Sequence, residues 1–118
     1  MKRTIAVAML LFAASAFGHT VLPLEVVAWL NAEETRERCG IARAGVMSER
    51  ADLLLIEVNA NWFRLGTNER QHLALEWRDL WRHAVASGRV SVIDVETRQP
   101  VVRYLPAGGV VVMQERKK

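Results

Sequence analysis

Four ionisable residues recur within one segment at a spacing that matches an α-helix. They are His72, Glu76, Asp79 and His83, at positions i, i+4, i+7 and i+11. On a helix these positions fall within roughly 60° of one another, so the four side chains would share one face. Imidazole and carboxylate groups bind metal ions and transfer protons. One hypothesis is therefore a metal-binding protein or a small metal-dependent enzyme.

These four residues cannot all bind one ion. A rise of about 1.5 Å per residue puts His72 and His83 roughly 16 Å apart, whereas zinc ligands lie about 2 Å from the metal. A zinc or copper site would need one pair, His72 with Glu76 or Asp79 with His83, and a further ligand from another segment. The alternative, which we favour, is a solvated helix edge that binds no cofactor.

Two apolar features are candidates for a protein interaction. Trp62 and Phe63 lie between predicted elements, and Trp is enriched in binding hot spots. The last predicted strand contains Val110 and Val112 and no charge, so a partner strand could add along its edge. The competing interpretations are that Trp62 and Phe63 close one end of the core, and that charged residues 115–118 protect the strand from aggregation.

Motifs for other chemistry are missing from the sequence. No serine stands in a G-x-S-x-G pattern, and Gly108-Gly109 precedes a predicted strand rather than the helix that a phosphate-binding loop requires. Cys39 is the only cysteine, so no intramolecular disulfide can form, and we expect it to be buried. We therefore expect a non-catalytic binding or interaction module.

The first eighteen residues have the three parts of a secretory signal peptide. Two basic residues open the chain, residues 5–12 are apolar, and residues 13–16 are small. Cleavage is expected after Ala16 or Gly18, and the second site would leave His19 as an N-terminal copper ligand. We expect export, with the periplasm as the destination and extracellular release as the alternative, and an envelope or secreted protein as partner.

The charge of the chain depends partly on this leader. Without its two basic residues, the formal net charge falls from +3 to +1. The remaining arginines are interspersed with acidic residues, and the only basic run is the tail at 116–118. Because nucleic-acid binding requires a clustered basic face, we expect no nucleic-acid partner.

One small α+β domain, residues 19–115, should remain after cleavage. Large apolar side chains at helical spacing predict a helix that covers a sheet, and this stripe comprises Leu73, Trp77, Leu80, Trp81 and Ala84. We expect one or two helices on a three- to four-stranded sheet, in the order α-β-α-β-β-β, with 40–50 as a loop. The predicted elements are a helix within 23–39 that ends at Gly40, a strand at 53–58, a helix between Thr67 and Gly88, and a meander of strands at 90–95, 101–105 and 110–113.

Overall fold

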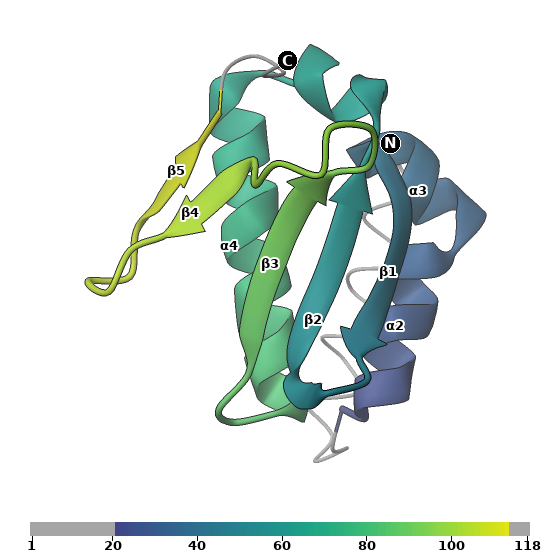
Figure 1. Ribbon diagram of the computed structural model, residues 1–118, viewed down its shortest axis with the longest axis vertical. Helices are drawn as coiled ribbons and strands as arrows, with labels where there is room; N and C mark the ends of the chain where they lie inside the picture. The colour runs from purple at the N-terminus through teal and green to yellow at the C-terminus, as the bar shows by residue number, and fades with distance from the viewer. Residues whose placement is uncertain (1–20, 114–118) are drawn as a thin grey trace.

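The computed structural model of the protein describes residues 21–113 (Figure 1). It confirms a small α+β domain, with three α-helices, a sheet of three strands and a sheet of two strands in this part of the chain. None of the helices in this range is long and apolar enough to cross a membrane. The signal peptide predicted at 1–18, His19 and the tail at 116–118 lie outside the described residues.

The helix predicted within 23–39 is two helices. They are α2 (Pro23–Asn31) and α3 (Glu33–Cys39), and the extended backbone of Ala32 separates them. Pro23 occupies the first turn, where its missing N–H is tolerated. Gly40 ends α3 as predicted, with a φ of 73°. A Cβ on Gly40 would also collide with the backbone nitrogen of Trp62, so this position excludes other residues on two grounds.

The loop predicted at 40–50 is wrong. Residues Ile41–Met47 form strand β1, which pairs in antiparallel fashion with β2 (Arg50–Val58). Gly45 indicated a loop, but it lies opposite Leu55 within the ladder. Local propensity is weak in this segment, and pairing with the apolar strand β2 decides its conformation.

A helical crossover joins two parallel strands of the sheet. After the short 3₁₀ helix Ala60–Arg64, α4 (Thr67–Ala84) leads from β2 to β3 (Arg89–Asp94), which pairs parallel to β2. The three-stranded sheet therefore has the order β1-β2-β3. All three helices lie behind this sheet in Figure 1.

The predicted continuous meander after β3 is wrong. Strands β4 (Val102–Tyr104) and β5 (Val110–Val112) form a separate antiparallel hairpin that lies against α4. The Tyr104 hydroxyl donates to the Ala74 carbonyl at 2.8 Å, which ties β4 to the helix. The Arg70 guanidinium on α4 ties the end of β5 to the helix, by donating to the Met113 carbonyl at 2.5 Å. These contacts hold the hairpin against α4.

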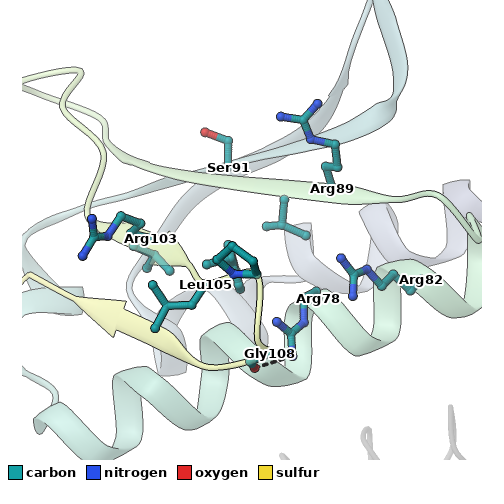
Figure 2. Close-up of a pocket in the computed structure, with 11 residues that line it drawn as sticks. Arg78, Arg82, Arg89, Ser91, Arg103, Leu105 and Gly108 are labelled. Carbon is teal, nitrogen blue, oxygen red and sulfur yellow. Dashed lines mark hydrogen bonds between the residues drawn. The ribbon is translucent and has the colours of Figure 1, made fainter.

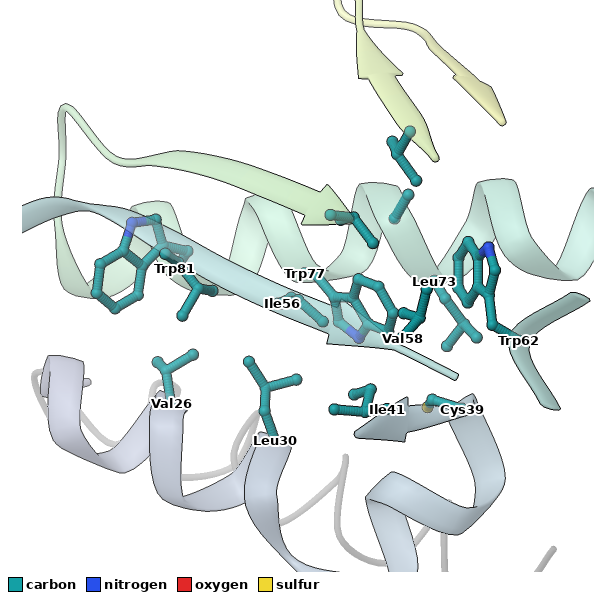
Figure 3. Close-up of a cluster of buried hydrophobic side chains, with 14 of the residues drawn as sticks. Val26, Leu30, Cys39, Ile41, Ile56, Val58, Trp62, Leu73, Trp77 and Trp81 are labelled. Atoms are coloured by element: carbon teal, nitrogen blue, oxygen red, sulfur yellow. The ribbon is translucent and has the colours of Figure 1, made fainter. Parts of the chain in front are cut away.

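The core lies between the helices and the covered face of the three-stranded sheet (Figure 3). The apolar stripe on α4 is confirmed at Leu73, Trp77 and Trp81, which are all buried. Trp62 packs on Trp77 with their ring centroids 5.4 Å apart. The Cys39 thiol is free and fully buried, as expected. Helix α4 thus contributes two large buried side chains to the core, Trp77 and Trp81, and the 3₁₀ helix adds Trp62.

Candidate functional site

The ionisable residues on α4 do not come together with a third ligand. His72, Asp79 and His83 are exposed and Glu76 is half-buried. Across residues 21–113, no group of three or more His, Cys, Asp or Glu side chains is placed to hold a metal ion. The Asp79 carboxylate lies 3.8 Å from the Arg78 guanidinium instead. The geometry gives the metal hypothesis no further support.

The apolar candidates for a protein interaction lie in the core or against it. Trp62 is fully buried, and Phe63 is half-buried beside it. Val112 is 6% exposed, and Val110 is half-buried. The Trp62 indole is therefore not available at the surface, and the uncharged strand β5 turns Val112 inward.

An arginine-lined pocket lies elsewhere, between α4, β3 and the β4–β5 hairpin (Figure 2). Its volume is about 470 Å³. Four arginines line it, namely Arg78 and Arg82 from α4, Arg89 from β3 and Arg103 from β4. The lining residues in the described part of the chain include no Asp, Glu, His or Cys. The pocket therefore concentrates four positive charges with no negative charge in its wall.

The local structure explains where each arginine points. Arg78 and Arg82 are four residues apart on α4, so they share one helix face. On β3, Val92 faces the core, so Arg89 lies on the opposite face of the strand. On β4, Val102 is buried, and Arg103 alternates to the exposed side. Two arginines thus rise from the helix beneath the pocket, and two flank it on the strands above (Figure 2).

The two helix arginines are partly engaged within the protein. Arg78 donates to the Gly108 carbonyl at 2.9 Å, and its guanidinium lies 5.7 Å from the centre of the Tyr104 ring. Burial raises the pKa of Tyr104, so its hydroxyl stays protonated and keeps donating to Ala74. Arg82 donates to the Gly88 carbonyl at 3.2 Å. These contacts fix the floor of the pocket.

The two strand arginines are uncommitted. Arg89 and Arg103 are exposed, and neither side chain makes a hydrogen bond or ion pair with another residue in the range 21–113. A guanidinium offers several N–H donors in a planar fork that matches carboxylate and phosphate groups. The Ser91 hydroxyl beside them adds a neutral donor. The arrangement is suited to binding an anion.

Sequence reasoning missed this site because its members are far apart along the chain. Arg78 and Arg103 are separated by 25 positions, and the arginines looked like part of a mixed-charge surface. The one local signal was the spacing of Arg78 and Arg82, which places two cations on the same face of the clearest helix. The position of the hairpin, which brings in Arg103, could not be read from the pattern.

Comparisons with known proteins add no functional assignment. No protein-family model, curated protein or solved structure matches this chain significantly.

Proposed function

We propose that this protein is an exported, periplasmic, non-catalytic binding module that recognises an anionic group of its partner through the arginine-lined pocket. The observation that carries the proposal is that four arginines from three elements line one pocket, whose described lining includes no acidic residue. The proposed export rests on the signal-peptide pattern of residues 1–18.

The composition of the pocket supports binding rather than catalysis. General acid–base chemistry at neutral pH requires a group such as His, Asp or Glu within hydrogen-bond reach. Ser91 is the one hydroxyl-bearing side chain in the lining besides Tyr104, and the described lining offers it no base. Arginine remains protonated at physiological pH. The pocket can thus hold and orient an anion.

Isothermal titration with tripolyphosphate and with citrate tests this function. The double variant R89Q/R103Q removes the two uncommitted charges and leaves the engaged Arg78 and Arg82 in place. Each lost contact at this exposed site should weaken binding by about 1 kcal/mol, so the variant should bind roughly 30-fold more weakly.

A matched control removes the same charge elsewhere. Arg50 lies 3.6 Å from Asp52, and Arg64 donates to Asn61, both outside the pocket lining. The variant R50Q/R64Q should retain affinity close to that of the wild type. Equal losses in the two double variants would show that net charge, rather than the pocket, governs binding.

A further inference from the structure

Strands β3 and β4 meet at one end and then separate. Ile93 forms an isolated bridge with Pro100, and the Val101 N–H donates to the Val92 carbonyl at 2.9 Å. Past this point no backbone hydrogen bond joins the two strands in the described range. The arginine-lined pocket opens here, with residues 89–91 on one side and 102–104 on the other.

Both strands present open backbone groups to this gap. Successive residues of a strand point their N–H and C=O groups to opposite sides. Because the Val92 carbonyl points toward the β4 side, the backbone groups of Val90, two residues earlier, point the same way. At the two ends of β4, the Val101 carbonyl accepts from the Met113 N–H and the Leu105 N–H donates to the Gly109 carbonyl, beside β5, so the backbone groups of Val102 and Tyr104 alternate away from β5. An unpaired edge of this kind is a template for another strand.

The free edge of β1 is blocked at Ala44 by contrast. The Asn31 side chain accepts from the Ala44 N–H at 2.9 Å and donates to the Ala44 carbonyl at 2.8 Å. It therefore occupies the two backbone groups that a partner strand would use there. The gap between β3 and β4 has no such cover in the described structure.

The arginines determine which strand would fit. A strand in the gap would place alternate side chains above and below the sheet. Those above would lie near Arg89 and Arg103, and those below would face Arg78 and Arg82 on α4 (Figure 2). Acidic side chains on both faces would be matched by opposite charge.

We propose that the ligand of this pocket is an extended acidic segment of a partner protein, which adds as a β-strand between β3 and β4. This inference rests on the proposed function and specifies its partner. Backbone hydrogen bonds to the two edges would provide affinity, and the four arginines would select acidic side chains. The stretch of β3 that lines the pocket, residues 89–91, corresponds to about 10 Å of strand, so the core of the segment is short.

The test uses a capped heptapeptide, acetyl-Thr-Glu-Glu-Val-Glu-Glu-Thr-amide, which places two glutamates on each face of a strand. The comparison peptide has the same sequence with its three central peptide nitrogens methylated, which keeps the charge and removes backbone donors. We expect the parent peptide to bind at least 10-fold more tightly than the methylated one to the full mature protein. We also expect slower amide hydrogen exchange at Val90, Val102 and Tyr104, and no change at Ala44.

The outcomes separate this inference from the proposed function. Equal affinity for both peptides, or binding of tripolyphosphate without the parent peptide, would overturn strand addition while leaving the anion-binding function intact. Binding of neither peptide nor tripolyphosphate would overturn both. Preference for a single-stranded oligonucleotide over the parent peptide would overturn the assignment to a protein partner.

Discussion

Replacement of Asn31 by alanine should destabilise the fold by about 1.5 kcal/mol. The Asn31 side chain makes two hydrogen bonds to the backbone of Ala44, at 2.9 and 2.8 Å. Each such bond contributes about 1 kcal/mol net. Alanine is favoured over asparagine in a helix by about 0.5 kcal/mol, which offsets part of the loss at the end of α2. For a domain of this size, the expected fall in Tm is roughly 6–12 °C.

Urea denaturation, followed by the fluorescence of the buried tryptophans, measures this change. The control is Asn68→Ala, the same replacement at an exposed position of α4 for which the structure shows no hydrogen bond of the side chain in the described range. It should leave stability unchanged or raise it slightly. If Asn31→Ala is as stable as Asn68→Ala, the Asn31 side chain does not hold the edge of β1, and the contrast drawn between the two sheet edges fails.

Three further perturbations test the packing and electrostatics of the domain. Gly88→Ala would place a Cβ 2.5 Å from Cδ1 of Trp81, so the free energy of unfolding measured in urea should fall by about 1–3 kcal/mol. Gly45→Ala is the control, and it should lose little because the space around Gly45 is open. The pKa of Glu57 is lowered, chiefly because its carboxylate accepts a hydrogen bond from Arg43. A hydrogen bond from Arg98 acts in the same direction, and burial acts in the opposite direction. This stabilisation is present above the ordinary carboxyl pKa and is lost as the pH falls below about 4.3. The free energy of unfolding of the wild type should therefore fall between pH 7 and pH 3 by an amount that Glu57→Gln does not show. Burial raises the pKa of Cys39 to about 11, so its thiol should react with iodoacetamide only after unfolding, and rapid labelling of the native protein would contradict its placement.

The elements with strong local signals could be predicted from the sequence. The 3.6-residue period of large apolar side chains defined α4, which connects β2 to the parallel strand β3. Strand β1 was missed because its glycine-containing sequence has little preference of its own and takes its conformation from β2. Single interactions with distant residues, such as the bond from Tyr104 to Ala74, separate the hairpin from β3, and no local pattern encodes them.

The candidate site shows the same division. The residues singled out for their chemistry, such as His72 and His83, are prominent locally but lie exposed on one helix without a third ligand in the described chain. The arginines of the pocket carried no distinctive local signal, because the sequence contains many arginines and the site forms only when β3, β4 and α4 meet. Position in the fold, rather than residue type, makes them a site.

The most direct test of the arginine-lined pocket observes the guanidinium groups themselves. The Nε–Hε signals of arginine can be followed by NMR while tripolyphosphate is added to the protein. If the pocket binds anions, the signals of Arg89 and Arg103 will shift in a saturable manner, and those of Arg50 and Arg64 will stay in place. Uniform shifts of all four, or no shift at Arg89 and Arg103, would contradict it.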